Sequence, residues 1–537
     1  MAVSFIIRGG TVLDGSGKPG VQADIAVSGD RVVKIGEIAE VPGAQELDAR
    51  GCMVSPGFIN VLSHAYITLQ QDPRGLSDLY QGVTTQIFGE GASLGPVRAS
   101  MTSSMSEEIL GFGSLPAGVR ASWPSLRGFL EQLERKGVGF NVGSFVGAVN
   151  LRAAVAGNAK RQLSPSELQE ACELLDEELS DGALGVGSAL IYPPGSYADT
   201  AELIAYSKVL ARHDALYISH LRSEGDRLLE GVQELIEISR ASGARAEVYH
   251  LKAVGQENWS KLPLALDLIE AARSEGLTVT ADVYPYAAGG TGLISSIPPR
   301  FRIGGITGLR RYLDNTEGRE EIRAAFFVED PDWENLYAAS GGAQGVVILS
   351  AIPSLGVQPG TSLAAIAQKR GNSDPLHTLM DLLDVEPLTD AAYFMADEDN
   401  VRLAFDRPWV SVGSDSDAPS TEELFAGHPV HPRAFGAFAR VIGRYSRDEE
   451  RVSIEEAVRR LTALPAENLR LKDRGSISVG AFADIAVFRL DEIADTATYA
   501  RPATYATGMR HVLVNGVPAL YEGHPTGALN GQALRRN

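Results

Sequence analysis

Two histidines stand where neighbouring β-strands are expected to end. In the segment LYISHLRSEGDRLLEGVQELIEISRASGARAEVYHLK, His220 follows the apolar run 216–219 and His250 follows the run 246–249. Apolar residues at helical spacing occupy 228–239 between them, so the pattern predicts a strand, a helix and a second, parallel strand. Both histidines then lie at the same edge of the sheet, where α/β barrels carry their chemistry.

A functional role for this pair has to be weighed against a structural one. A single histidine at a strand end is usually a hydrogen-bonded structural residue. Two of them one βαβ step apart, in a chain with 9 histidines, favour a metal or catalytic site. Cys52 and Cys172 are the only cysteines, so neither a disulfide framework nor a cysteine-rich zinc site is available.

His64, Glu90 and Asp415 each follow a further apolar run and complete the candidate set. A divalent metal held by imidazoles and a carboxylate, with a second carboxylate free to move a proton, is the arrangement that activates water against an amide carbonyl. The free carboxylate takes the proton and returns it to the leaving nitrogen. For Asp415 alone, helix capping or loop solvation is an equally good explanation, so its position after VSVGS leaves the question open.

Alternating strands and helices through the middle of the chain are needed to position these side chains. Amphipathic stretches such as 164–179 and 264–272 predict helices between the strands, and the series is typical of a TIM-like (β/α)8 barrel. Glycine-rich segments at 288–292 and 340–345 are expected to be loops over the barrel mouth. The candidate strands lie at 58–62, 82–88, 140–149, 185–188, 216–219, 246–249, 277–283, 345–349 and 410–413.

Short strands separated by Gly and Asp turns occupy both ends of the chain. A chain of 537 residues is too long for one simple core, and the strands at the two ends predict one small β-sandwich beside the barrel. We expect residues 1–55 plus 475–537 to form this domain and residues 56–474 to form the barrel.

Composition narrows the class of protein. Hydrophobic residues make up 44% and charged residues 22%, which is ordinary for a soluble globular enzyme. The net charge of −20 argues against nucleic acids and anionic membranes as partners. Neither a secretory signal nor an apolar run of membrane-spanning length is present in the sequence, so a cytoplasmic location is expected.

A set of motifs resembles the amidohydrolase superfamily, specifically its N-acyl-D-amino-acid deacylase (D-aminoacylase) branch. The resemblance extends over nearly the whole chain, and the order and spacing of the motifs make it specific. The motifs are RGGTVLDGSG, PGFIN, QGVTT, ISHLRSEGD, HLK, DVYPYAAG, VGSD, HPRAFG, DRGSISVGAFADIAVF and VLVNG.

The resemblance implies a metal-dependent (β/α)8 barrel with a β-sandwich built from both termini. It implies that His220 and His250 are metal ligands, that Asp415 is the catalytic acid and base, and that water activated by the metal is the nucleophile. It also implies that a lysine, a tyrosine and an arginine bind the substrate carboxylate, which agrees with the way an arginine fork grips a carboxylate. In this chain the implied carboxylate ligands are Lys252, Tyr284 or Tyr286, and Arg433.

Two departures from the family pattern change the expected metal site. The family usually carries His-x-His after the first strand, whereas PGFINVLSHA has Leu62 at the first position and only His64 at the second. Leucine cannot bind metal, so a two-metal site is not expected. The family's bridging cysteine is replaced in GEGAS by Gly91, and Glu90 one residue earlier is expected to be a ligand, or else a second acid/base or a solvated residue.

Three functions follow from this site. The leading one is a hydrolase that deacylates an N-acyl (D-)amino acid or a related small-molecule amide. It would use one divalent metal, expected to be zinc, although His and carboxylate ligands also accept iron, manganese or nickel. The second is a cyclodehydratase that condenses an amine onto an amide carbonyl with loss of water, forming an imidazoline-type ring, because an apolar first-strand edge would exclude water. The third is a non-catalytic binding protein. Barrels of this kind often form homo-oligomers, which the sequence leaves open.

Overall fold

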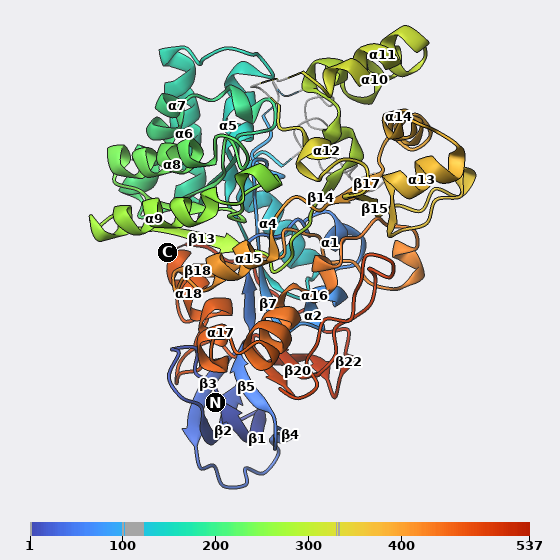
Figure 1. The fold of residues 1–537 in the computed structure, drawn as a ribbon. Coiled ribbons are helices and arrows are strands. Elements are labelled where there is room, and N and C mark those ends of the chain that lie inside the picture. The colour runs from blue at the N-terminus through green and yellow to red at the C-terminus, as the bar shows by residue number, and fades with distance from the viewer. Residues whose placement is uncertain (1–2, 99–100, 102–122, 329, 331–332, 537) are drawn as a thin grey trace.

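The computed structural model describes residues 3–98, 101, 123–328, 330 and 333–536 of the chain. Figure 1 shows three regions. A sheet built by both ends of the chain lies at the bottom of the view, and a central set of parallel strands with helices outside them lies above it. A helix-rich insertion, labelled α10 to α14, lies at the upper right.

Strands from both termini join in one sheet of nine strands, ordered β22-β21-β20-β19-β5-β1-β2-β3, with β4 paired to β1. The strands expected to form a small β-sandwich are therefore hydrogen-bonded into one continuous sheet. Ile7, Val54 and Leu513 belong to its hydrophobic core. The strands are β1 (Phe5–Val12), β2 (Val21–Ser28), β3 (Arg31–Gly36), β4 (Gln45–Asp48), β5 (Met53–Pro56), β19 (Ile485–Phe488), β20 (Met509–Val514), β21 (Val517–Tyr521) and β22 (His524–Pro525).

Two parallel sheets carry the strands on which the candidate site depends. One has three strands in the order β6-β7-β8, and the other has six in the order β18-β13-β12-β11-β10-β9. Only Phe145 separates β8 from β9, and a parallel bridge between Ser63 and Ser416 links the chain after β6 to the chain after β18. Within each parallel sheet the strands follow one another in chain order, and β13 is followed directly by β18. The strands are β6 (Phe58–Asn60), β7 (Val83–Phe88), β8 (Asn141–Ser144), β9 (Val146–Gly147), β10 (Gly185–Ala189), β11 (Leu216–His220), β12 (Arg245–Val248), β13 (Val279–Val283) and β18 (Val410–Val412).

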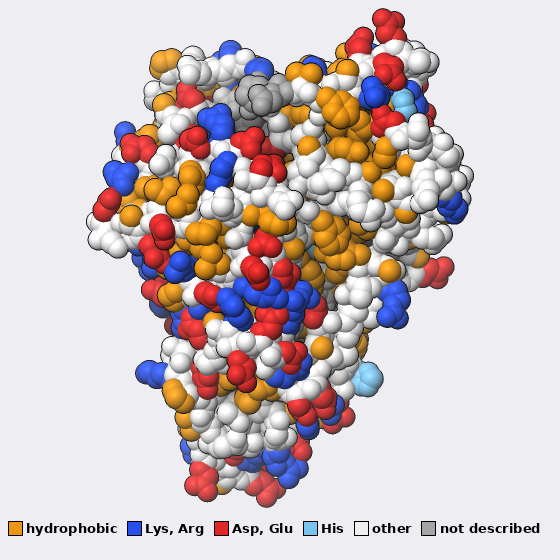
Figure 2. Space-filling model, in the orientation of Figure 1, with side chains coloured by type: hydrophobic (Ala, Val, Ile, Leu, Met, Phe, Trp, Pro, Cys, Tyr) orange, Lys and Arg blue, Asp and Glu red, His pale blue; other side chains and the backbone are white. Residues whose placement is uncertain are grey.

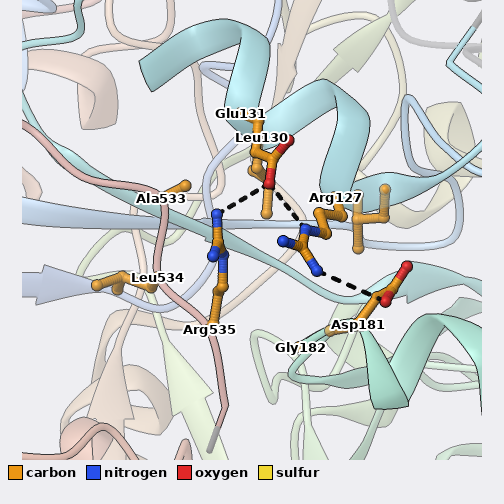
Figure 3. Close-up of a pocket in the computed structure, with 10 residues that line it drawn as sticks. Arg127, Leu130, Glu131, Asp181, Gly182, Ala533, Leu534 and Arg535 are labelled. Atoms are coloured by element: carbon orange, nitrogen blue, oxygen red, sulfur yellow. Dashed lines mark hydrogen bonds and ion pairs between the residues drawn. The ribbon is translucent and has the colours of Figure 1, made fainter. Parts of the chain in front are cut away.

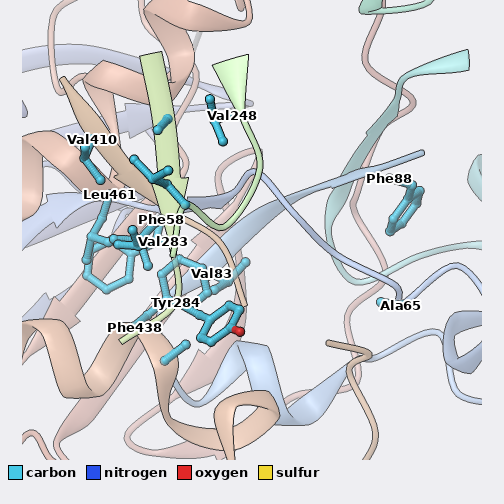
Figure 4. Close-up of a cluster of buried hydrophobic side chains, with 14 of the residues drawn as sticks. Phe58, Ala65, Val83, Phe88, Val248, Val283, Tyr284, Val410, Phe438 and Leu461 are labelled. Atoms are coloured by element: carbon cyan, nitrogen blue, oxygen red, sulfur yellow. The ribbon is translucent and has the colours of Figure 1, made fainter. Parts of the chain in front are cut away.

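Helices between the parallel strands, and others after the last of them, bury apolar side chains against these strands. Helix α6 begins at a capping box, in which the Ser164 hydroxyl accepts the Glu167 backbone N–H and the Glu167 carboxylate accepts the Ser164 N–H. The shared core includes Phe58, Val283 and Tyr284 (Figure 4). The helices are α4 (Leu126–Lys136), α5 (Ala148–Ala156), α6 (Pro165–Ser180), α7 (Thr200–Arg212), α8 (Leu228–Ser242), α9 (Lys261–Ser274), α15 (Glu398–Phe405), α16 (Arg433–Arg440), α17 (Ile454–Leu461) and α18 (Ala463–Asn468).

An insertion between β13 and β18 forms a separate antiparallel sheet, ordered β14-β17-β15-β16, with its own hydrophobic core. The prediction that 345–349 is a barrel strand is wrong, because this run forms β15, which pairs antiparallel with β16 and β17. The expected loop 288–292 contains β14. The insertion comprises β14 (Gly289–Gly292), α10 (Gly305–Leu313), α11 (Thr316–Ala325), α12 (Leu336–Ala339), β15 (Val346–Ile348), β16 (Thr361–Ser362), α13 (Leu363–Arg370), α14 (Pro375–Val385) and β17 (Asp390–Tyr393).

The chain beyond β22 returns to the parallel strands. The Val142 N–H donates to the Gln532 carbonyl at 2.9 Å, and Arg535 forms an ion pair with Glu131 at 3.0 Å (Figure 3). The pocket between this tail and α4 measures about 10 Å³, room for no more than one water. The tail therefore contributes to packing rather than to ligand binding.

Charged side chains of both signs are spread over the surface. Figure 2 shows acidic and basic side chains intermixed over one face rather than a single basic patch. Within the part of the chain that the structure describes, none of the helices combines the length and apolar character that a membrane crossing needs.

Candidate metal centre and substrate cavity

A cavity of about 410 Å³ lies at the carboxyl ends of the parallel strands, between them and the insertion. Tyr286 is not part of its lining, because its hydroxyl points to Asp495 at 3.4 Å and its ring lies against Arg440. The other side chains predicted for the site do line the cavity: His64, Glu90, His220, Lys252, His250, Tyr284, Asp415 and Arg433.

Glu90, His220 and His250 form one group of potential metal ligands. Glu90 Oε1 lies 3.1 Å from His220 Nδ1 and 3.0 Å from His250 Nε2, and one ligand atom from each residue lies within 4.8 Å of the others. Two atoms bound to zinc at about 2.1 Å in a tetrahedron are about 3.4 Å apart. The spacing and the chemistry of the two imidazoles and one carboxylate therefore fit a zinc site.

His64, Glu90 and Asp415 form a second group that shares Glu90 with the first. His64 Nε2 lies 3.2 Å from Glu90 Oε2 and 3.0 Å from Asp415 Oδ1. On its other side, Asp415 Oδ2 lies 2.8 Å from the Arg433 guanidinium. Glu90 thus faces two histidines with one oxygen and His64 with the other.

The charges in this row stabilise one another. Burial raises the pKa of Glu90, but the charge of His250 and the hydrogen bonds from His220, His250 and His64 outweigh it and hold that pKa well below its usual range. Burial lowers the pKa of His64, yet its hydrogen bonds to Asp415 and Glu90 bring it to about 9. Asp415 is also buried, and Arg433 and His64 lower its pKa. Both carboxylates are therefore ionised at neutral pH, ready to bind a cation or accept a proton.

Glu224 is a site residue that the sequence interpretation missed. It lies 3.0 Å from His250 Nδ1, 3.5 Å from His220 Nε2 and 2.6 Å from Lys252 Nζ. Contacts of this kind fix the orientation of metal-binding imidazoles. Its position four residues after His220, in the motif ISHLRSEGD, was the available signal.

The insertion reaches the site through Glu334, a second residue that sequence interpretation missed. Glu334 Oε1 accepts hydrogen bonds from the Ser223 hydroxyl at 2.7 Å and from the backbone N–H groups of Glu224 at 2.8 Å and Gly225 at 3.1 Å. It thereby holds the loop from which Glu224 extends. No local sequence pattern relates Glu334 to this loop, because 109 to 111 residues separate the partners.

The backbone is unusual at two of the functional positions. His250 has φ of 34° and Asp415 has φ of 48°, in the left-handed region that non-glycine residues rarely adopt. Asp282 Oδ1 accepts the His250 N–H at 3.1 Å, and the Leu62 carbonyl accepts the Asp415 N–H at 2.9 Å. Leu62 therefore lies outside the cavity lining but holds Asp415 in place through its backbone.

The two cations of the cavity differ in how fully they are partnered. Lys252 Nζ lies 2.6 Å from Glu224 Oε1 and 2.9 Å from His250 Nδ1. Arg433 is 4% exposed, stacks 4.7 Å from the centre of the Tyr284 ring and donates to the Gly290 carbonyl. Its buried Nε has no hydrogen-bond partner among the described residues. Arg433 lines the cavity, so its guanidinium is placed to meet an anionic ligand there.

Comparison with known sequences identifies relatives over the full length. The amidohydrolase family model matches residues 353–519. The N-acyl-D-glutamate deacylase of Alcaligenes xylosoxydans xylosoxydans is 32% identical over 536 residues, covering 100% of this chain and 97% of the relative. The D-aminoacylase of the same organism is 30% identical over 535 residues, covering 99% and 97%.

Solved structures agree with these sequence relationships. The N-acyl-D-glutamate deacylase of Bordetella bronchiseptica, complexed with zinc and a phosphonate inhibitor, has a TM-score of 0.82 and 30% identity over 100% of both chains. A D-aminoacylase with a binuclear metal centre, described by one-metal activation and second-metal attenuation, has a TM-score of 0.81 and 29% identity over 99% of this chain and 100% of its own.

Proposed function

Because this chain belongs to the amidohydrolase family, in its N-acyl-D-amino-acid deacylase branch, we propose that it is a metal-dependent hydrolase that removes the acyl group from an N-acyl-D-amino acid. One observation carries the proposal: the Glu90–His220–His250 group lies in the same cavity as Asp415 and Arg433. The proposal includes a closed (β/α)8 barrel as the scaffold.

Glu90, His220 and His250 would hold one zinc ion. A metal there supplies Lewis acidity, polarising the amide carbonyl and lowering the pKa of water toward about 7. Glu224 orients the two imidazoles and keeps a negative charge beside them. Leu62 offers no ligand atom, and this supports a single-metal site over a binuclear one.

Asp415 is the proposed proton carrier. Its carboxylate is ionised and is held between His64 and Arg433, so its orientation is restricted before substrate binds. It would accept the proton of the attacking water and then donate it to the leaving nitrogen, which converts a poor leaving group into a neutral amine.

Arg433 is the proposed anchor for the substrate carboxylate. Its position in the cavity lining supports this role, and the Tyr284 ring limits the movement of its guanidinium. Lys252 adds positive charge nearby, although its ammonium already contacts Glu224 and His250. Tyr284 completes this side of the cavity, so the tyrosine of the YPY segment that we propose for substrate binding is Tyr284.

The alternatives raised by the sequence gain no support from the relatives. The three full-length curated relatives are named as deacylases or D-aminoacylase, and none of those names refers to a condensation. The ionised Asp415 and the ligand group at Glu90 argue against a purely binding role.

The proposal can be tested with metal analysis and product mass. Purified protein should contain about one zinc per chain, and the double variant His220→Ala, His250→Ala should lose it. Asp415→Asn should retain zinc but lose deacylation of N-acetyl-D-amino acids by at least about 10²-fold. Asp399→Asn, whose side chain is 87% exposed, is the matched control and should match the wild type. A product lighter than the substrate by one water, or full activity in Asp415→Asn, would refute the proposed reaction.

A further inference from the structure

The part of the cavity nearest the insertion carries ionisable side chains that the proposed chemistry does not use. Asp390 begins β17, Asp417 lies two residues after Asp415, and His428 precedes the HPR motif. All three line the same cavity as the candidate metal ligands. They therefore face whatever part of the substrate extends away from the reacting amide.

Asp390 is held rigidly by its backbone but not by its carboxylate. Its N–H donates to the Ser350 hydroxyl at 3.0 Å, and it pairs with Gly292 of β14. Its carboxylate has no hydrogen bond or ion pair with any residue in the described part of the chain. Burial and the neighbouring charge of Asp417 raise its pKa to about 7. A lone carboxylate in this position is stabilised most by a cation that enters the cavity.

The neighbouring cations lower the pKa of Asp390, but each of them is already paired with another carboxylate. His428 Nε2 contacts Asp417 Oδ2 directly, so any positive charge on His428 is already matched by Asp417. Lys252 and Arg433 are the only lysine and arginine among the described residues of the lining. Lys252 contacts Glu224, and Arg433 contacts Asp415.

Arg433 fixes which end of the substrate faces Asp390. Its guanidinium suits the α-carboxylate of an amino acid, as proposed above. Its charge also lowers the pKa of Asp390, and both residues line the same cavity. An amino acid held at Arg433 can then direct its side chain toward Asp390. A second carboxylate on that side chain would meet Asp390 and Asp417 without a free cation in the lining.

We propose that Asp390 determines side-chain specificity and that the preferred substrates are N-acyl-D-amino acids with a cationic side chain, an amine or a guanidine. This inference rests on the proposed deacylase function. It separates the chain from the relatives named for D-glutamate and D-aspartate, whose substrates carry the opposite charge.

The test compares kcat/KM of the zinc-loaded enzyme for N-acetyl-D-lysine, N-acetyl-D-leucine and N-acetyl-D-glutamate. A charge-assisted contact predicts about a 10- to 100-fold preference for the lysine over the leucine derivative, with the glutamate derivative the poorest. Asp390→Asn should reduce the lysine-to-leucine ratio about 10-fold or more, and Asp390→Lys should reverse the order of lysine and glutamate. The exposed control Asp399→Asn should keep the wild-type ratios.

Two results would overturn the inference while leaving the deacylase proposal intact. One is a wild-type preference for the glutamate derivative. This result would weigh most if Arg302→Met removed the preference, because Arg302 interacts electrostatically with Tyr192 and Tyr393 of the cavity lining. The other is an unchanged lysine-to-leucine ratio in a folded Asp390→Asn variant. Absence of hydrolysis for every derivative by zinc-loaded protein would instead reject the deacylase function, and the inference with it.

Discussion

Removal of the Glu334 carboxylate should weaken metal binding from outside the ligand group. One oxygen of Glu334 accepts three hydrogen bonds from the loop 223–225, and Glu224 in that loop contacts both candidate ligand histidines. A hydrogen bond to a charged group is worth about 1.5–3 kcal/mol, but three donors sharing one partly exposed oxygen do not add fully. We therefore expect Glu334→Ala to release the loop by about 3 kcal/mol.

Only part of this energy reaches the metal site, because Glu224 keeps its contact with Lys252 at 2.6 Å. Loss of residues that support metal ligands typically costs about 10- to 100-fold in metal affinity, and we expect Glu334→Ala to fall in that range. The assay is chelator competition for zinc, together with kcat and KM on one N-acetyl-D-amino acid. Glu334→Gln is the matched control, since its amide oxygen still accepts the three donors and should keep affinity within about 3-fold.

A merely structural role would give a different pattern. If Glu334→Ala lowers the melting temperature but binds zinc as tightly as the wild type, the hydrogen bonds of Glu334 stabilise the fold without affecting the metal ligands. If Glu334→Gln loses as much affinity as Glu334→Ala, the negative charge rather than the hydrogen-bond geometry is responsible. Either result would refute the reasoning above.

Two further predictions concern substrate binding and stability. Arg433→Lys removes the fork that grips a carboxylate, so kcat/KM should fall by about 10- to 100-fold while zinc content is retained, and unchanged kinetics would contradict the anchor role. Burial raises the pKa of Glu247 from 4.5 to about 7, so this carboxyl favours the folded state fully below pH 4.5, and that contribution is lost as the pH rises through about 7. Glu247→Gln should remove this loss, so the variant should be more stable than the wild type at pH 8 by up to about 3 kcal/mol. Urea unfolding of both proteins at pH 5 and pH 8 measures the difference. The same change in stability between the two pH values in both proteins would argue against the buried charge.

The positions of the candidate ligands could be predicted because each lies at the end of a strand or within two residues after it. A parallel strand ends at a fixed edge of its sheet, so a residue at or just beyond the end of an apolar run, such as His220 or Glu90, needs no further information to be placed there. The same argument located Asp415 after β18. Local sequence was sufficient to place these residues at the sheet edge. Only the order of the strands within the sheet, which decides which residues are neighbours, depends on the fold.

Elements whose environment is set by distant chain segments were not predictable in this way. The run at 345–349 has the apolar character of a barrel strand, but β15 pairs antiparallel inside the insertion, and a short apolar run does not distinguish the two. Glu334 and Asp390 act on the cavity only because the insertion folds over it. Tyr284 and Tyr286 occupy one short motif, yet only the first lines the cavity, because Tyr286 packs against Arg440 and Asp495, which lie far along the chain.

The two departures from the family motif act together in favour of a single-metal site. Leu62 removes an imidazole at the end of β6, and Glu90 brings a carboxylate from the neighbouring β7. One Glu90 oxygen faces His220 and His250, and the other faces His64. A second ion would have to be held by the His64–Glu90–Asp415 group. Such an ion would occupy the carboxylate that the proposed proton transfer needs, so with this set of residues the deacylase mechanism is best served by one metal.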